Sequence, residues 1–232
     1  WSRFRDMEPD EMFQNFIRND KKKPGVFQFV KELNGNAGNS YAAYIKDAVF
    51  MIPTPQLLHR VVDMLDDIPM ESRDMKGDIY EYLLSHLTTA GRNGQFRTPR
   101  HIILMMVSLI DPKPDDIICD PACGTAGFLV SAGEYLRDKH PEIFRKDSLR
   151  DHFMNEMFCG IDFDATMLRI SVMNLLQHGV ENPRISGKDS LSETNAAMRE
   201  MCTVILANPP FKGSLDYDSV SNDLLKVAKT KK

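Results

Sequence analysis

Apolar residues follow two different patterns along the chain, one in each part. Up to residue 92 they recur at helical spacing between charged or Gly- and Asn-rich linkers, without a convincing strand. One such pattern follows Thr54 and covers residues 57–65, with Pro55 suited to a first helical turn. Another begins at Ile79 and stops at Gly91. Residues 1–92 are therefore predicted to form a small helical domain.

From about residue 95, helices and strands alternate. Helices are predicted after Pro99 to about residue 110, at 126–139 and at 164–178, and strands at 116–120, 157–162, 184–186 and 202–207. The strands are continuously apolar, which is typical of a parallel sheet with both faces covered. Residues 140–155 are interpreted as an added polar loop. The predicted class is α/β, with residues 93–232 as the second domain.

The last predicted strand indicates something about its surroundings. Residues 204–207 are apolar on both faces, which predicts an interior strand, yet residues 212–232 are polar and offer no neighbouring strand. Either another chain covers that edge or the natural protein continues, and we favour continuation. The chain also begins at Trp1 rather than Met, which indicates a trimmed or excised piece.

Composition narrows the classes of protein. With 42% hydrophobic and 27% charged residues, the 232-residue chain does not resemble a disordered protein. Its formal charge of −4 argues against a basic nucleic-acid-binding surface over the whole molecule. The longest apolar stretch, residues 102–110, is far below the roughly 18 residues of a membrane span, and we expect no membrane partner.

Cysteine and histidine usage indicates the compartment and argues against a metal site. The 4 cysteines are too few and too dispersed for a disulfide scaffold, which favours reduced core residues in a cytoplasmic protein. No C-x-x-C or H-x-x-x-H pair occurs among these cysteines and the 6 histidines, so no metal is expected.

Polar residues that follow the predicted strands carry the candidate chemistry. In parallel sheets, ligands bind beyond the carboxyl ends of the strands, where Asp120, Asp162, Asp189 and Asn208 would collect. The turn after Asp120 contains Gly124 and Gly127, which permit close backbone approach and positive φ, and it leads into free helix N–H groups.

The spacing of these glycines differs from the dinucleotide pattern G-x-G-x-x-G. An acid at the strand end would repel a pyrophosphate and suits a ligand with an ammonium group. The alternative for this turn is a tight strand–helix connection with an Asp cap.

The other two acids are also open to two interpretations. Asp162 can accept hydrogen bonds from ribose hydroxyls, or it can cap the helix that begins near Asp164. Asp189 can accept from an exocyclic amine, or it can be a solvated loop residue.

The sharpest local feature is Asn208 followed by Pro209, Pro210 and Phe211. Two prolines end the strand and fix the chain as it leaves the sheet. The Asn208 amide oxygen and the Pro209 carbonyl then form two nearby acceptors for a planar –NH2 group, while its lone pair turns toward an electrophile. Phe211 offers a flat face for stacking a base. The alternative is a strand-ending turn with a buried Phe.

Four segments together resemble the modification (DNA methyltransferase) subunit of type I restriction–modification systems, in the adenine-N6 methylase family. The resemblance covers residues 77 to about 215. The matching segments are Gly94-Gln95-Phe96-Arg97-Thr98-Pro99, the loop 120–128, Gly160-Ile161-Asp162 followed by Met173-Asn174-Leu175, and the Asn-Pro-Pro-Phe segment 208–211.

The resemblance implies a Rossmann-like methyltransferase sheet of which this chain holds the first half, the carboxyl-terminal strands being absent. It also implies a role for each matching residue. Asp120 and Thr98 would hold the amino-acid portion of S-adenosylmethionine, Asp162 its ribose and Asp189 its adenine. Asn208, Pro209, Pro210 and Phe211 would hold a target adenine flipped out of the duplex. The remaining implied cofactor residues are Gln95, Phe96, Ala122, Cys123, Gly124, Thr125, Gly127 and Phe128.

The implied activity is site-specific methylation of adenine N6 in DNA. The implied partners are DNA, a separate specificity subunit, a second methyltransferase subunit and a nuclease/translocase subunit. Two alternatives remain open: methylation of a protein glutamine or an RNA base through the same pocket, or a non-catalytic interaction subunit. A nucleotide-binding dehydrogenase is disfavoured by the glycine spacing.

Overall fold

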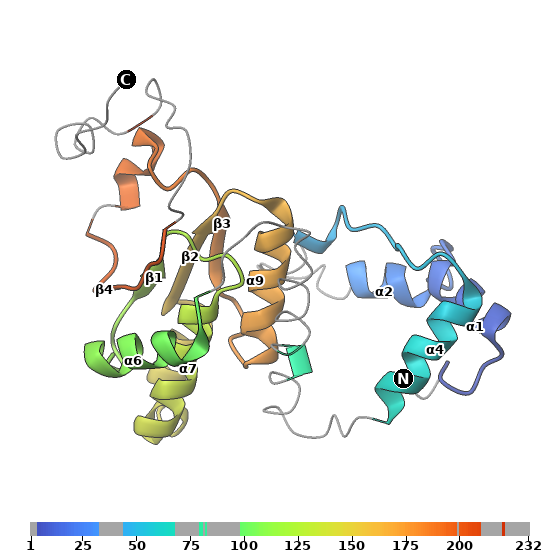
Figure 1. Ribbon diagram of the computed structural model, residues 1–232, viewed down its shortest axis with the longest axis horizontal. Helices are drawn as coiled ribbons and strands as arrows, with labels where there is room; N and C mark the ends of the chain where they lie inside the picture. The colour runs from blue at the N-terminus through green and yellow to red at the C-terminus, as the bar shows by residue number, and fades with distance from the viewer. Residues whose placement is uncertain are drawn as a thin grey trace. The chain divides into compact units, whose positions relative to one another are not determined.

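The computed structural model describes residues 4–32, 44–67, 79, 80, 82, 98–198, 200–209 and 220. The chain divides into two compact units, Trp1–Met75 and Lys76–Lys232, which are treated separately below (Figure 1). The predicted boundary at residue 92, and most of the helix predicted from Ile79 to Gly91, lie outside the described residues and stay predictions. Within the described segments, no helix is long and apolar enough to cross a membrane.

The first unit consists of helices. Its described elements are α1 (Pro9–Ile17), α2 (Val26–Glu32) and α4 (Pro55–Asp66), and α1 packs against both of the others. The predicted start of α4 is confirmed, because the Thr54 hydroxyl caps it by accepting the Leu57 N–H at 3.3 Å. A small apolar core holds the unit together; its buried members are Phe4, Met12, Leu58 and Val62.

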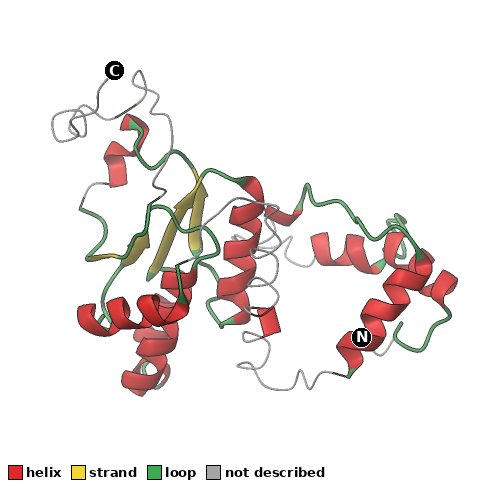
Figure 2. Ribbon diagram, viewed as in Figure 1, coloured by secondary structure: helices red, strands yellow, loops and turns green. Residues whose placement is uncertain are grey.

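The second unit contains a parallel sheet, as the sequence predicted (Figure 2). Its strands are β1 (Ile118–Asp120), β2 (Phe158–Asp162), β3 (Arg184–Gly187) and β4 (Val204–Ile205). They lie in the order β3-β2-β1-β4, and every neighbouring pair is parallel. This order brings the carboxyl ends of β1 and β2, the two strands that end in aspartate, side by side.

Two helices pack against this sheet, and a third packs against one of them. They are α6 (Arg100–Ile110), α7 (Gly127–Lys139) and α9 (Ala165–Gln177). The helix α7 packs on β1 and β2, α9 packs on β2 and β3, and α6 lies against α7. The contact between α7 and β2 is close, since a Cβ added at Gly133 would lie 3.3 Å from the Phe158 ring.

The prediction of a polar loop at residues 140–155 is wrong. This segment forms the 3-10 helix η1 (Pro141–Phe144) and the helix α8 (Asp147–Asn155). Phe153 of this segment is fully buried, and its ring meets those of Phe144 and, on β2, Phe158 edge to face, at centroid distances of 5.2 and 5.1 Å. Burial of these aromatic rings stabilises the segment despite its polar composition.

The last strand is shorter than predicted. Between β3 and β4 lies the 3-10 helix η2 (Glu193–Met198), and β4 then pairs with β1 through only two residues. In the described part of the chain β4 is at the edge of the sheet, and the Ile205 side chain is 64% exposed. The interior position expected from its two apolar faces is therefore not seen there.

All four cysteines are free thiols, and three are buried, as expected of reduced core residues. Burial raises the pKa of Cys119 to about 12 and that of Cys159 to about 11. High pKa values make these thiols poor nucleophiles. The described residues contain no group of three or more His, Cys, Asp or Glu side chains placed to hold a metal ion.

Candidate functional site

The two acids at the ends of β1 and β2 lie in one site. The register pairs Asp120 with Gly160, so β2 continues two residues further and carries Asp162 past the end of β1. The turn after β1 then bends over β2, where the Cys123 N–H donates to the Ile161 carbonyl at 2.9 Å. Residues 120–127, called the cofactor loop below, are therefore held against the end of β2.

Asp120 is almost fully buried, at 2% exposed. The pKa of its carboxyl is raised to about 7, chiefly by burial and in smaller part by the charge of Asp162, although a hydrogen bond from the Ala122 N–H (3.0 Å) acts in the opposite direction. Asp120 does not cap α7, because Ala126 occupies that position without a side-chain hydrogen bond. The interpretation of Asp120 as a helix cap is therefore wrong.

Asp162 joins the cofactor loop to β2. Its Oδ2 accepts the Gly124 N–H at 2.9 Å, and its Oδ1 accepts the Asp164 N–H at 2.8 Å. The cap of α9 is Asp164, which accepts the first-turn N–H groups of Thr166 and Met167 at 2.7 and 3.0 Å. The alternative role of Asp162 as a helix cap is thus excluded. Each of its oxygens keeps a second lone pair for a further donor.

The conformation of the cofactor loop differs in part from expectation. Gly124 has the expected positive φ, 51°, but Gly127 is the first residue of α7 and the second left-handed residue is Ala126, with φ of 63°. The close approach expected at Gly127 is confirmed, because an added Cβ would lie 3.2 Å from the Ile103 side chain. The Phe128 ring, predicted to belong to the cofactor site, is buried at 4% exposed.

The end of β4 brings Asn208 to the same edge of the sheet. The Leu206 N–H donates to the Cys119 carbonyl at 2.9 Å, so the chain that leads to Asn208 runs directly beside the end of β1. The Asn208 Nδ2 donates to the Thr98 Oγ1 at 2.9 Å. This contact joins two predicted site residues 110 positions apart in the sequence. The contact uses the amide nitrogen of Asn208 and not its amide oxygen.

Several predicted site residues cannot be placed. Gln95, Phe96, Pro210 and Phe211 lie outside the described residues. Asp189 is exposed two residues beyond β3 and accepts the Leu191 N–H at 2.9 Å, which is what the interpretation as a solvated loop acid expects. Its contact with a cofactor stays a prediction.

Two residues that contact the cofactor loop were not predicted as site residues. Both Ser171 and Asn174 are fully buried on α9, and Asn174 Nδ2 donates to the Thr125 carbonyl at 2.8 Å. The sequence does contain a signal for them: they are polar residues three positions apart on a helix whose other buried side chains are mostly apolar.

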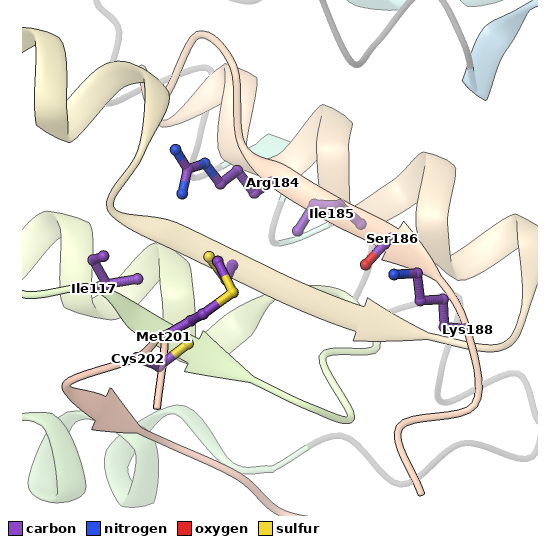
Figure 3. A pocket seen from close by; sticks show the side chains of 8 residues that line it. Ile117, Arg184, Ile185, Ser186, Lys188, Met201 and Cys202 are labelled. Atoms are coloured by element: carbon purple, nitrogen blue, oxygen red, sulfur yellow. The ribbon is translucent and has the colours of Figure 1, made fainter. Parts of the chain in front are cut away.

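A pocket of about 180 Å³ lies apart from these residues, on the face of the sheet opposite to the one on which α7 packs (Figure 3). Register partners share a face, so Cys159 and Arg184 of this pocket lie on the face opposite to Phe158, whose ring packs under α7. None of the predicted site residues lines it. Its lining residues are Ile117, Cys159, Arg184, Ile185, Ser186, Lys188, Met201 and Cys202.

The chain thus has the class of fold in which helices cover a parallel sheet, with aspartates at the carboxyl ends of two neighbouring strands. The N-6 DNA methylase family model matches residues 71–231, and the chain belongs to this family. Its relatives within the family include methylase subunits of type I restriction enzymes. The EcoEI subunit of Escherichia coli is 35% identical over 173 residues, which are 72% of this chain and 34% of the relative. The EcoKI subunit of E. coli K12 is 30% identical over 69% of this chain and 33% of the relative.

A solved structure shows the same fold. A modification subunit from Vibrio vulnificus YJ016, described as that of a type I restriction enzyme, superposes with a TM-score of 0.72 at 29% identity, over 90% of this chain and 47% of that one. A type I restriction–modification structure at 22% identity shares the fold with a TM-score of 0.67. The chain spans about a third of the length of the curated relatives it matches.

Proposed function

We propose that this chain forms the methyl-donor site and part of the target-base site of a DNA methyltransferase that modifies adenine N6. The main support for this proposal is one contact: Asn208 is hydrogen-bonded to Thr98 at the same sheet edge as Asp120 and Asp162. A donor site and a base site must adjoin for direct methyl transfer, and here the residues proposed for each are joined.

The electrostatics of the cofactor loop fit S-adenosylmethionine. A carboxyl whose pKa is raised by burial gains most from a cation placed beside it, and Asp120 is such a group. The ammonium of the methionine portion would lie at Asp120, with Thr98 near that end, and the ribose hydroxyls at the free lone pairs of Asp162. The open first-turn N–H groups of α7, where Val130 makes the first intrahelical bond to Ala126, suit the cofactor carboxylate.

The target base would be held by the Asn-Pro-Pro-Phe segment. The Asn208 amide oxygen and the Pro209 carbonyl would accept the two N–H bonds of the adenine amine, and Phe211 would stack on the ring. The base must leave the duplex to reach them, at a cost of a few kcal/mol. When bound, the cofactor would supply an electrophilic methyl group, and the two acceptors would hold the amine with its lone pair directed at that group. The protein acts by positioning and hydrogen bonding.

The similarity to type I methylase subunits supports a proposal for the partners of this chain. We propose that a specificity subunit reads the DNA sequence, that a second methylase subunit completes the enzyme, and that a nuclease/translocase subunit joins it in restriction. The chain's formal charge of −4 agrees with sequence reading by another subunit. We expect the complex to act in the cytoplasm, where its DNA is.

Methyl transfer from labelled S-adenosylmethionine tests the proposal. The full-length protein, together with its specificity subunit, should label adenine in duplex DNA and leave added protein and RNA unlabelled. Label on a protein glutamine or on RNA would replace the proposal with the corresponding alternative. A full-length protein that binds no cofactor in calorimetry would favour a non-catalytic interaction subunit.

The raised pKa of Asp120 predicts a pH dependence of cofactor binding. The ionised carboxylate is needed for the ammonium, so affinity should fall about tenfold per pH unit below about 7. The ligand's own α-amino group loses its proton above about pH 8, so affinity should be highest between these two values. Calorimetry at several pH values measures both limbs.

The matched variant is Asp120→Asn, which keeps an oxygen to accept the Ala122 N–H. This variant should bind the cofactor weakly, and its affinity should no longer fall as pH drops below about 7. A fall in affinity that persists in the variant would assign it to another group.

The stability of the fold depends on the same pKa. Because folding raises the pKa of Asp120 from 3.8, protonation of this carboxyl favours the folded state as pH falls from about 7 toward 4.

A further inference from the structure

A buried side-chain amide on α9 is hydrogen-bonded to the cofactor loop. Asn174 on α9 is 0% exposed, and its Nδ2 donates to the Thr125 carbonyl at 2.8 Å, across 49 positions of sequence. One turn earlier on the same helix, the fully buried Ser171 hydroxyl donates to the Leu168 carbonyl at 2.9 Å and lies beside the Cys123 thiol. The helix α9 therefore presents two polar side chains to the loop.

The peptide that Asn174 holds has a strained neighbour. Peptide groups are planar, so fixing the Thr125 oxygen also fixes the direction of the Ala126 N–H. That N–H donates to the Cys123 carbonyl at 2.7 Å and closes the turn. Ala126 has φ of 63° and ψ of 28°, a left-handed conformation that is unfavourable for a residue with a Cβ. Rotation of this one peptide would relieve Ala126 and open the turn.

The anchor is itself fixed to the helix that follows the loop. The Asn174 carbonyl is hydrogen-bonded to His178 Nδ1 at 2.8 Å, and the His178 carbonyl accepts Arg137 Nη2, from α7, at 2.6 Å. The loop is thus clamped between α9 and α7, two elements that pack on the same strand β2. A rotation of the 125–126 peptide must break both the Asn174 bond to the Thr125 carbonyl and the Ala126 N–H bond to the Cys123 carbonyl.

We propose that Asn174 is a positioning residue, which holds the peptide between Thr125 and Ala126 in the orientation that the cofactor requires. This inference rests on the proposed function, because it takes the loop to be the cofactor site. In this proposal, the helix α9 keeps the left-handed residue Ala126 in its conformation before the ligand binds. Preorganisation of this kind raises affinity by removing the ordering cost at binding.

Two variants test the anchor in the full-length protein. Asn174→Ala removes the donor, and Asn174→Leu removes it while filling the volume, in case the alanine variant does not fold. Each should lower the affinity for S-adenosylmethionine about tenfold, the worth of one hydrogen bond to a buried carbonyl. Asn182→Ala is the control, because Asn182 bonds Asn155 at 2.6 Å, outside the cofactor loop. Its affinity should change less than about twofold.

A second substitution separates positioning from simple loss of packing. Ala126→Gly removes the Cβ that makes the left-handed conformation unfavourable. In the Asn174→Ala background, it should recover a large part of the lost affinity, although it restores no contact. Hydrogen exchange of the amides at 122–126 should follow the same order: fast in Asn174→Ala and slower again in the double variant.

The outcomes distinguish this inference from the proposed function. Tight binding by the parent protein and unchanged binding by both Asn174 variants would overturn the role of Asn174 and leave the function standing. Weak binding that Ala126→Gly does not rescue, with unchanged exchange at 122–126, would also overturn it. A parent protein without affinity for S-adenosylmethionine would overturn the proposed function itself.

Discussion

Replacing Asn208 with alanine should lower adenine methylation by about 10²–10³-fold, while affinity for S-adenosylmethionine changes little. The amide oxygen is proposed to hold the target amine during transfer, whereas its Nδ2 contacts only Thr98 among the described hydrogen bonds. Single-turnover transfer to duplex DNA measures the first quantity and calorimetry the second. Thr98→Val removes the hydroxyl that Asn208 contacts and leaves the amide in place; because Thr98 is itself proposed to lie beside the cofactor, transfer is compared at saturating S-adenosylmethionine, where it should fall less than in Asn208→Ala.

An equal loss of methylation and of cofactor affinity in Asn208→Ala would contradict this assignment. Asn208 would then serve folding or cofactor binding instead. Thermal unfolding of the variant separates these two possibilities, since a residue needed for folding lowers the melting temperature as well.

Asp162→Ala should lower cofactor affinity about 100-fold, through two effects that act together. It removes the proposed ribose acceptor, and it leaves the Gly124 N–H in the cofactor loop without its carboxylate partner. Each charge-assisted hydrogen bond is worth about 1.5–3 kcal/mol, and a loss of about 2.7 kcal/mol corresponds to 100-fold. Calorimetry with S-adenosylmethionine measures this loss.

The matched control is Asp164→Ala, two residues away. It removes the cap of α9 and should cost about 1 kcal/mol of stability, but within the described residues the Asp164 carboxylate is hydrogen-bonded to Thr166 and Met167 and not to the cofactor loop. Cofactor affinity should therefore stay close to that of the parent. Similar affinity losses in both variants would show that the end of β2 acts through α9 stability rather than through the loop.

The sequence was most informative where a local pattern suffices. Thr54 and Pro55 marked the start of α4, and the apolar runs before Asp120 and Asp162 marked two strands at their observed ends. The pattern failed at residues 140–155, where buried Phe153 sits among charged residues at a spacing that single-sequence periodicity does not separate from a loop.

The candidate site was predictable as a set of residues, and its internal bonds were not. Asp120, Asp162 and Asn208 follow strands, so parallel order alone brings them to one edge. Which oxygen accepts which N–H depends on contacts between residues far apart in sequence: Asp162 with Gly124, Asn174 with Thr125, and Asn208 with Thr98. No local spacing encodes these pairs.

Gly160 has a consequence for how this protein can diverge. A Cβ at that position of β2 would lie 2.6 Å from the Ile185 side chain and 3.1 Å from the Cys123 sulfur, so even alanine would push the cofactor loop away from the strand. In a lineage that keeps the cofactor loop packed against β2, we therefore expect glycine to be retained at position 160.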